Sequence, residues 1–362
     1  MKLRILASIL SVLTFSAQAA APGQYSVTSL GSLVGLDMNN HGQVAGYSFA
    51  SGTQQAAIYN GGVVSGIAGT TGISFANGIN DAGQISGNFG DYAERGFLYS
   101  SGSLTAIAGF EAYGIDNQGN VAGILSHSGP FGANTTTSSL YANGQTTDVS
   151  LGGQFMRTIG ISKGGTMYGF GNPPDSGGMS PYTYRNGVLT DYSSVFGDSA
   201  FVGAANDHNQ LLGMNTSSMS HFTYFNGVVD YLPSGVGYQS LNNSGWAVGG
   251  LQDTTNSSFL KGLLLVDGVS YDLNSLIDPA AGWNITSASV INENNQILAQ
   301  GCNASGCGSL LLSPLTAGSP AGSPVAGPVA AVPEPETYGM MLFGIGAIGL
   351  AARRRRKQAA ME

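Results

Sequence analysis

A nine-residue motif that recurs along the chain constrains its fold more than any other feature. Its consensus is I-N-x-x-G-Q-x-x-G, an apolar residue and Asn or Asp followed by a glycine-containing polar turn. Seven copies have their second positions at residues 39, 80, 116, 162, 206, 242 and 292, at intervals of 41, 36, 46, 44, 36 and 50 residues. A repeat of about 40–45 residues is typical of the four-stranded blades of a β-propeller.

A second pattern lies between these copies: an apolar-aromatic strand, a turn and another strand. The turn dipeptides are Asn60-Gly61, Asn143-Gly144, Asn186-Gly187, Asn226-Gly227 and Asp267-Gly268, with Ser101-Gly102 as a weaker variant. Asn-Gly and Asp-Gly favour tight hairpins, because both central residues of such a turn adopt positive φ. Each repeat is therefore predicted to hold two hairpins, and hence four strands.

The seventh repeat is one strand short. Its third strand is predicted at Ser309–Leu312, and Ser313-Pro314 then ends it without a hairpin partner. The N-terminal segment Gln24–Gly31 resembles the fourth strand of a repeat. If the two segments pair, no sheet edge is left exposed. We therefore predict an all-β fold over residues 24–313, a seven-bladed β-propeller closed by its N-terminal strand.

The second copy, GINDAGQISG at residues 78–87, could be a hairpin turn or a metal loop. Its near-copies exchange Asp for Asn and Ser, and the alternating acids of a calcium-binding EF-hand are missing. The turn is thus the better interpretation. Asn80 is expected to cap it through its side chain, Gly83 to take positive φ, and Ile79 and Ile85 to enter the blade core. No metal or cofactor is predicted.

The N-terminal residues 1–19 have the pattern of a secretory signal peptide. Lys2 and Arg4 precede the apolar run Ile5–Phe15, and Ala17-Gln18-Ala19 follows as a small-residue cleavage site. Cleavage is predicted between Ala19 and Ala20, so the mature chain is expected to be exported.

A second membrane signal lies at the C-terminal end. The apolar run Tyr338–Ala352 is shorter than the ~20 residues that usually span a bilayer. A basic cluster follows at once, and positive clusters stay cytoplasmic, which places the preceding chain outside. Residues 314–332, rich in Pro, Ala, Gly and Ser, are expected to form a linker between the propeller and this single short transmembrane helix.

The triplet Pro333-Glu334-Pro335, the short apolar run and the cluster Arg353, Arg354, Arg355 and Arg356 occur in a fixed order. Over residues 333–357 the chain resembles a PEP-CTERM sorting signal. The resemblance implies that an exosortase in the inner membrane of a Gram-negative bacterium recognises and removes this tail. The protein would be transiently anchored in that membrane and would then reside at the cell surface or outside the cell. An ordinary single-pass anchor is the alternative.

The two repeat patterns also resemble a named repeat. The segment Arg95–Gly102, of the form R-x-F-L-Y-x-x-G, and the lead-in Tyr25–Gly31 look like the extracellular HAF-type repeat. The fourth copy departs from it, with Ser162 in place of Asn. The resemblance implies an exported repeat protein and names no ligand.

The charge of the body limits its partners. Outside the targeting ends, 17 acids face five cations, giving a net charge of −12; the cations are Arg95, Arg157, Lys163, Arg185 and Lys261. Such a surface cannot form a phosphate-tracking groove, so no nucleic acid is expected to bind. It would also repel an anionic polysaccharide unless a divalent cation bridged the two.

The only two cysteines, Cys302 and Cys307, lie close together in sequence. In an exported protein such a pair predicts a local disulfide. A zinc site would need further ligands nearby.

No catalytic constellation emerges from the sequence, because the four histidines are scattered along the chain and no nucleophile motif is present. We expect a non-enzymatic protein with a structural or adhesive role in an exopolysaccharide-associated matrix, contacting exopolysaccharide or other matrix proteins. Two alternatives stay open. One is a glycan-binding propeller that uses Trp246, Trp283 and Tyr238 as stacking platforms. The other is a polysaccharide lyase or hydrolase with Arg95, Arg157 and Arg185 in the central channel.

Overall fold

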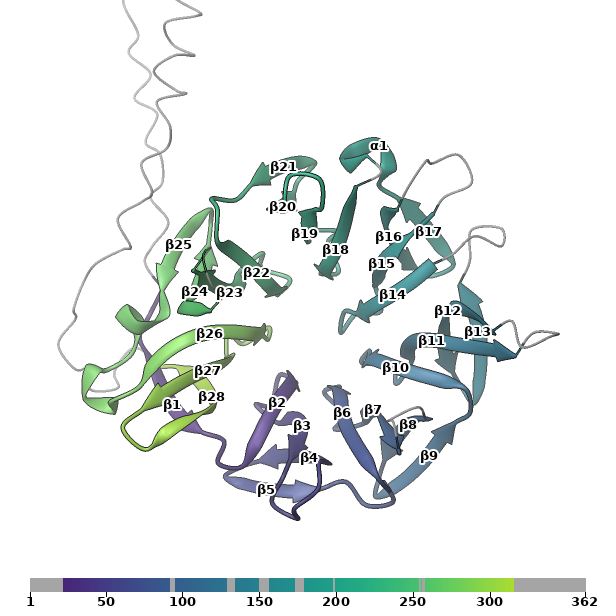
Figure 1. The fold of residues 1–362 in the computed structure, drawn as a ribbon, viewed down its shortest axis with the longest axis horizontal. Coiled ribbons are helices and arrows are strands. Elements are labelled where there is room, and N and C mark those ends of the chain that lie inside the picture. Colours follow the sequence, from purple (N-terminus) through teal and green to yellow (C-terminus); the bar gives the residue numbers. More distant parts are fainter. Residues whose placement is uncertain are drawn as a thin grey trace, which may run out of the picture.

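Seven four-stranded antiparallel sheets stand around a central axis (Figure 1). The computed structural model describes residues 22–91, 95–128, 134–149, 156–172, 179–197, 199–253, 255 and 258–315. The prediction of an all-β, seven-bladed propeller with four strands in each blade is confirmed.

The blades are numbered along the chain. Blade 1 consists of β2 (Leu33–Met38), β3 (Val44–Ser48), β4 (Gln55–Asn60) and β5 (Val63–Gly66), and blade 2 of β6 (Ile73–Ile79), β7 (Ile85–Gly90), β8 (Arg95–Ser100) and β9 (Ser103–Ile107). Blade 3 consists of β10 (Phe110–Ile115), β11 (Val121–Ser128), β12 (Asn134–Ala142) and β13 (Gln145–Val149), and blade 4 of β14 (Met156–Ile161), β15 (Met167–Gly171), β16 (Ser180–Arg185) and β17 (Val188–Asp191). Blade 5 consists of β18 (Ala200–Ala205), β19 (Leu211–Asn215), β20 (Ser220–Phe225) and β21 (Val228–Tyr231), and blade 6 of β22 (Val236–Leu241), β23 (Ala247–Gln252), β24 (Phe259–Val266) and β25 (Val269–Asp272). Blade 7 consists of β26 (Asn284–Ile291), β27 (Ile297–Asn303), β28 (Gly306–Pro314) and β1 (Tyr25–Ser29).

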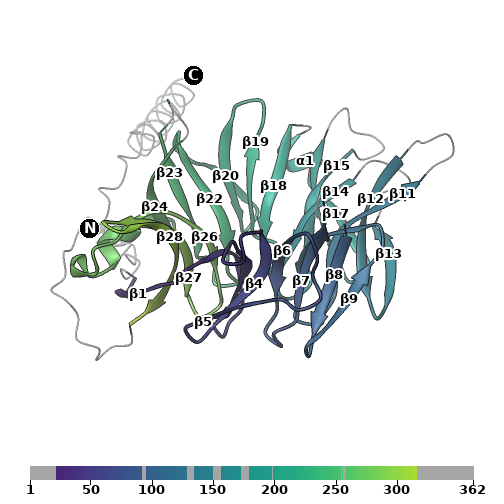
Figure 2. The same ribbon diagram turned by 60° about the horizontal axis from the view of Figure 1, so that its bottom comes forward.

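Among the described residues, three short helices lie in the connections between blades. They are α1 (Ser193–Phe196) and the 3-10 helices η2 (Leu273–Leu276) and η3 (Pro279–Ala281). Helix η2 begins where the Asp272 carboxylate accepts the Asn274 N–H, and Leu273 and Leu276 enter the core beside blade 7. In a tilted view the blades stand side by side around the axis, so that the ring of blades has two faces (Figure 2). We call the face that carries the turns between first and second strands the turn face.

The last blade combines the two ends of the described chain. Strand β1 pairs antiparallel with β28, with Val27 opposite Leu312. Strand β28 is longer than the predicted Ser309–Leu312, because it begins directly at the hairpin after Asn303 and continues through Pro314.

The hairpin turns use positive φ as their sequences require. In the first hairpin of blade 2, Gly83 has φ 74°, and in the second hairpin of blade 4, Asn186 has φ 51°. One predicted turn was misplaced by a residue. In blade 1 Asn60 pairs with Val63, so the central residues are Gly61 and Gly62 rather than Asn60 and Gly61.

The first strand of each blade carries a bulge, which explains the last glycine of the repeat motif. In β6 the register shifts between Ala76 and Gly78. The Phe75 carbonyl oxygen then stands 2.0 Å from the position that a Cβ on Gly87 would occupy. A carbonyl comes equally close, within 2.5 Å, at the glycines that end five other copies of the motif, Gly46, Gly123, Gly169, Gly213 and Gly249. Any side chain there would collide with the neighbouring strand.

The apolar core is divided into clusters that run from one blade to the next. Ile79 and Ile85, on either side of the blade 2 turn, are both buried as predicted, and they pack with Phe97 and with Ala45 of blade 1. No helix within the described residues is long and apolar enough to cross a membrane. The run Tyr338–Ala352 lies outside the described part of the chain.

Candidate functional site: the turn ring and the central channel

Each repeat motif builds one turn around its second residue, which is Asn in five copies, Asp in the third and Ser in the fourth. Asn80 is completely buried, and its Oδ1 accepts the backbone N–H of Gln84 at 2.9 Å. The Gly83 N–H donates to the Asn80 carbonyl at 3.0 Å. The structural roles predicted for Asn80 and Gly83 are therefore confirmed.

The side-chain amide of the same asparagine connects its blade to the next one. Asn80 Nδ2 donates to the Asp116 carbonyl of blade 3 at 2.9 Å. Asn292 Nδ2 donates in the same way to the Asn39 carbonyl at 2.9 Å, which joins blade 7 to blade 1. Equivalent bonds are made by Asn39, Asn206 and Asn242. Buried amides of the motif thus form most of a ring of hydrogen bonds around the axis.

The two motif copies that lack Asn complete this ring by other means. Asp116 has no side-chain N–H, and the backbone N–H of Asn117 donates instead to the Lys163 carbonyl at 2.8 Å. Ser162 is too short to reach a carbonyl, and its hydroxyl donates to the Asp207 carboxylate at 2.5 Å. The irregular copies are therefore substitutions within one common scheme of blade-to-blade bonding.

The third motif position forms a second, more exposed ring in which amides and acids alternate. Asn40 donates to both carboxylate oxygens of Asp81, through its backbone N–H at 2.8 Å and its side chain at 2.9 Å. Asn117 Nδ2 donates to Asp81 from the other side at 2.7 Å. Asn243 and Asp207 repeat this pairing at 2.9 Å. The acids of the turn face are thus held by amide donors.

The pKa values of this ring follow from its hydrogen bonds. Burial acts to raise the pKa of Asp81, but the hydrogen bonds from Asn40 and Asn117 outweigh it, so that the pKa lies below its ordinary value of 3.8. Burial raises the pKa of Glu293, and the nearby negative charges of Asp207 and Asp81 raise it further. Among the described residues no group of three or more His, Cys, Asp or Glu side chains could hold a metal ion.

A cavity of about 250 Å³ lies on the axis. Its walls include the bulge residues of the first strands, Leu36, Asn77, Tyr113, Ile159, Gln239 and Ser289. Lys163 of blade 4 crosses this space. Its Nζ lies 2.6 Å from Asp37 Oδ2 of blade 1 and donates to the Ile79 carbonyl of blade 2 at 2.6 Å. The side chain of Lys163, at the third motif position of blade 4, therefore links blades 1, 2 and 4 instead of joining the second, more exposed ring.

Asp37 and the cross-channel pair were not anticipated from the sequence. The only available signal was that Lys163 is the single cation at the third position of the seven motif copies. Tyr168 also lines the cavity, and burial raises its pKa, with a contribution from the negative charge of Asp37. The hydroxyl is thus neutral and can act as a hydrogen-bond donor in the channel.

The three arginines proposed for a lyase or hydrolase do not meet in the channel. Arg157 is the second residue of β14, the first strand of blade 4, and donates to the Tyr113 hydroxyl at 3.2 Å. Arg185 lies at the other end of the same blade and donates to the Asp207 carbonyl at 2.6 Å. Arg95 is exposed at the start of β8, the third strand of blade 2. The structure therefore does not bring these side chains together.

The aromatic residues proposed as glycan platforms are also separated. Tyr238 is buried, and its hydroxyl lies 2.6 Å from Ser270 Oγ. Trp246, directly before β23, and Trp283, directly before β26, are partly buried against the core cluster that blades 6 and 7 share. None of the three stands as an exposed platform.

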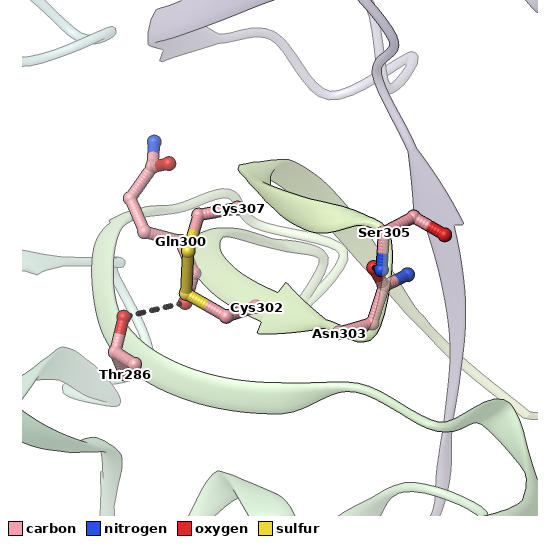
Figure 3. The surroundings of a disulfide bond; sticks show 6 residues. All are labelled: Thr286, Gln300, Cys302, Asn303, Ser305 and Cys307. Atoms are coloured by element: carbon pink, nitrogen blue, oxygen red, sulfur yellow. Dashed lines mark hydrogen bonds between the residues drawn. A yellow bond between two sulfur atoms is a disulfide. The ribbon is translucent and has the colours of Figure 1, made fainter.

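Cys302 and Cys307 form a disulfide across the β27–β28 hairpin (Figure 3). Their Cα atoms are 4.0 Å apart. On the neighbouring strand, the Thr286 hydroxyl donates to the Gln300 carbonyl at 3.2 Å. The bond therefore cross-links the blade that also contains β1. The predicted cleavage site at Ala19 and Ala20 and the sorting residues Pro333–Pro335 and Arg353–Arg356 lie outside the described residues.

The fold defines the class of this chain as a seven-bladed propeller, and comparison identifies its C-terminal signal. Residues 331–356 match the PEP-CTERM protein-sorting motif. The match covers the predicted triplet and arginine cluster, and it implies export, a membrane-anchored tail before processing and processing by an exosortase. No match to this chain was found among curated proteins.

Solved structures share only the fold. Oligogalacturonate lyase from Vibrio parahaemolyticus superimposes with a TM-score of 0.51 at 8% identity, over 81% of this chain and 98% of that one. Selenomethionine-substituted virginiamycin B lyase from Staphylococcus aureus gives a TM-score of 0.50 at 9% identity, over 81% and 99% of the two chains. At such identities the likeness shows the propeller architecture and carries no activity to this chain.

Proposed function

We propose that this chain is a non-enzymatic surface or matrix protein of a Gram-negative bacterium, exported, processed by an exosortase and retained in an exopolysaccharide-associated matrix as a structural or adhesive unit. The observation that carries the proposal is the sorting motif at residues 331–356, placed after a folded propeller. Signal-peptide removal after Ala19 would start the mature chain shortly before β1. The linker, residues 314–332, would separate the propeller from the membrane until the tail is cleaved.

The hydrogen bonding of the repeats supports a structural role. Asn80 and its equivalents are buried and bonded within and between blades. The pairing of β1 with β28 supports a ring closed by the N-terminal strand, and the Cys302–Cys307 disulfide strengthens the same blade. A ring built in this way is a rigid unit that suits a protein exposed outside the cell. We propose that its repeats are of the extracellular HAF type.

The test is to follow the protein in a native host with and without its exosortase, by fractionation of inner membrane, cell surface and medium. The unmodified chain should leave the inner membrane only when the exosortase is present. A variant with Arg353, Arg354, Arg355 and Arg356 changed to Ala should be retained or mislocalised, whereas Arg185→Ala, in the ring, should be sorted normally. Retention of the unmodified chain in the inner membrane of both strains would refute the proposal.

A glycan-binding role is the second candidate, favoured by an aromatic cluster that the sequence did not single out. Tyr47 packs edge-on against both Phe49 and Phe75, with ring centroids 5.6 and 5.4 Å apart, and Phe49 is 57% exposed. Exposed aromatic faces are suited to stacking on sugar rings. Titration of the host's purified exopolysaccharide into the protein would test this role. Binding that Phe49→Ala does not weaken would argue against this cluster as the glycan site.

A further inference from the structure

Three residues that depart from the repeat pattern meet in the central channel. Tyr168 is the only aromatic residue at the eighth motif position, where the other copies carry Ala, Ser, Val or Leu. Asp37 directly precedes the first copy, and the residue at this place is Gly, Ala, Ser or Val before the other six. Lys163 is the single cation at the third position. The other copies form their turns without such residues, yet all three line the cavity of about 250 Å³ on the axis.

The Tyr168 hydroxyl enters the channel wall over a glycine. Tyr168 pairs with Gly160 of β14, the first strand of the same blade, and a Cβ on Gly160 would stand 2.4 Å from the hydroxyl oxygen. The missing side chain therefore makes room for the hydroxyl. No described residue hydrogen-bonds to this hydroxyl, and it is not among the polar atoms that are sealed from solvent. It is a neutral donor that a molecule in the cavity can reach.

The Lys163–Asp37 pair also keeps hydrogen-bonding capacity. Asp37 Oδ2 accepts both Lys163 Nζ and the Ile79 N–H, at 2.6 and 2.8 Å, whereas Oδ1 accepts from no described residue and is not sealed from solvent either. Lys163 uses two of its three N–H donors, on Asp37 and on the Ile79 carbonyl. The pair can thus give a ligand one acceptor and one donor while its two charges compensate each other.

The bulge residues add both amides and aliphatic surface to the cavity wall. Asn77 Nδ2 donates to the Ala112 carbonyl at 2.8 Å, which leaves its Oδ1 as an acceptor, and the Gln239 side chain is exposed in the channel. Leu36, in the same lining, is 37% exposed, and Ile159 adds a second aliphatic side chain. Amides beside aliphatic surface match a sugar ring, because its hydroxyls donate and accept while its C–H groups are apolar.

Charge and size narrow the class of ligand further. Asp207 and Glu293 also line the cavity and would repel an anion, while an ammonium group would meet Lys163. The bulge residue of blade 5 is Gly203, which has no side chain to fill the space. The volume is slightly below the roughly 300–1,000 Å³ of drug-sized sites. It therefore suits a single neutral sugar unit better than an oligosaccharide.

We propose that the central channel is a binding site for one neutral pyranose unit. The sugar hydroxyls bond to the Tyr168 hydroxyl, Asp37 Oδ1 and Lys163 Nζ, and a C–H face of the ring packs against Leu36. This proposal deepens the second candidate function, glycan binding, and rests on it, but the site is distinct from the aromatic cluster that contains Phe49. The structural role and exosortase sorting do not depend on it.

The experiment is saturation-transfer difference NMR of the full chain with four neutral sugars: D-glucose, D-galactose, D-mannose and N-acetyl-D-glucosamine. At least one should bind saturably, with a dissociation constant on the order of millimolar, as expected for a ligand of about a dozen non-hydrogen atoms. The uronic acid and the amino sugar that match the best neutral hexose should bind at least about tenfold more weakly, because each brings a charge that the site opposes.

Two pairs of variants test the geometry. Tyr168→Phe removes only the hydroxyl and should raise the dissociation constant about three- to tenfold, whereas Tyr231→Phe, on the exposed end of β21, should leave it unchanged. Leu36→Trp should fill the cavity and abolish binding, whereas Val63→Trp, at an exposed position of β5, should not. Urea midpoints equal to that of the unmodified chain would show that each variant is folded.

The outcomes separate this site from glycan binding in general. The channel proposal would be overturned if none of the four sugars bound saturably, if Tyr168→Phe had no effect, or if folded Leu36→Trp still bound the sugar. Should purified exopolysaccharide bind the chain and its binding be lost in Phe49→Ala but kept in both channel variants, glycan binding would stand and the channel site would be wrong.

Discussion

The motif asparagines show how one side chain can satisfy two structural requirements. The Oδ1 of Asn80 closes its own turn, and its Nδ2 bonds to the next blade. Both tasks need an acceptor and a donor on a short side chain, and Asn provides this combination, whereas Asp lacks the donor. At Asp116 the blade-to-blade bond therefore passes to the backbone N–H of Asn117.

Asn80→Ala should destabilise the propeller by about 2–4 kcal/mol, because it leaves the Gln84 N–H and the Asp116 carbonyl without their buried partner. Urea unfolding followed by tryptophan fluorescence would measure the loss. His41→Ala, at an exposed position of the equivalent turn in blade 1, should change stability by no more than about 0.5 kcal/mol. Equal effects of the two changes would contradict the bonding scheme.

The Asp81 carboxylate should make stability depend on pH in the acid range. Its pKa is lower in the folded chain than its ordinary value of 3.8, since Asn40 and Asn117 hydrogen-bond to the charged form. The stabilisation is therefore present above that value and is lost as the pH falls through the folded pKa. The unmodified chain should be more stable than Asp81→Asn at neutral pH, and the difference should shrink below pH 4. A difference that stays constant throughout urea titrations from pH 6 to pH 3 would exclude this role.

At the scale of the element, the bulged first strand determines which residue must end each motif. The bulge brings a carbonyl of the first strand against the second strand, where Gly87 has no Cβ to obstruct it. The seventh copy ends instead in Ala299, and its first strand β26 differs by a second register shift. The motif's final glycine thus reflects the pairing of two strands rather than the turn that precedes it.

Gly87→Ala should destabilise the chain by about 2–3 kcal/mol, because the new methyl group would stand 2.0 Å from the Phe75 carbonyl and 2.6 Å from the Phe97 ring. Gly203→Ala provides the matched control, since nothing lies within 4 Å of its added methyl group. The control should leave the urea midpoint unchanged or slightly higher. If both variants had the same midpoint, the bulge would not be what requires glycine.

The elements of this fold could be predicted to a large extent because their signals are local. Short turn sequences such as Asn-Gly located the hairpins, and seven copies of the repeat motif at intervals of 36–50 residues predicted the number of blades. The error at Asn60 arose because a neighbouring second glycine, Gly62, offered an equally good turn one residue later. The residues that line the channel could not be predicted in this way. A bulge moves a residue off the regular alternation, so the inward-facing residues Tyr113 and Gly203 were not identifiable by periodicity.

At the scale of the whole molecule, the ring brings together residues that no local pattern relates. Lys163 and Asp37 are 126 positions apart and meet across the channel, where their side chains are 22% and 19% exposed. Each partner keeps a further hydrogen bond, since the Ile79 N–H donates to Asp37 and Lys163 donates to the Ile79 carbonyl. Blades 1, 2 and 4 are thus tied together at one point near the axis.

A double-mutant cycle with Lys163→Met and Asp37→Asn should therefore give a coupling free energy of about 1–3 kcal/mol, since a partly buried charge loses its counter-ion in each single variant while its second hydrogen bond persists. The pair Lys261–Asp272, 3.0 Å apart but with the lysine 46% exposed, should give less than about 1 kcal/mol in a parallel cycle. Urea unfolding at neutral pH and again in high salt provides the measurement. Because salt screens exposed charges more than buried ones, the Lys163–Asp37 coupling should persist in high salt while the Lys261–Asp272 coupling disappears. A channel coupling no larger than the surface one would mean that the pair does not hold the blades together.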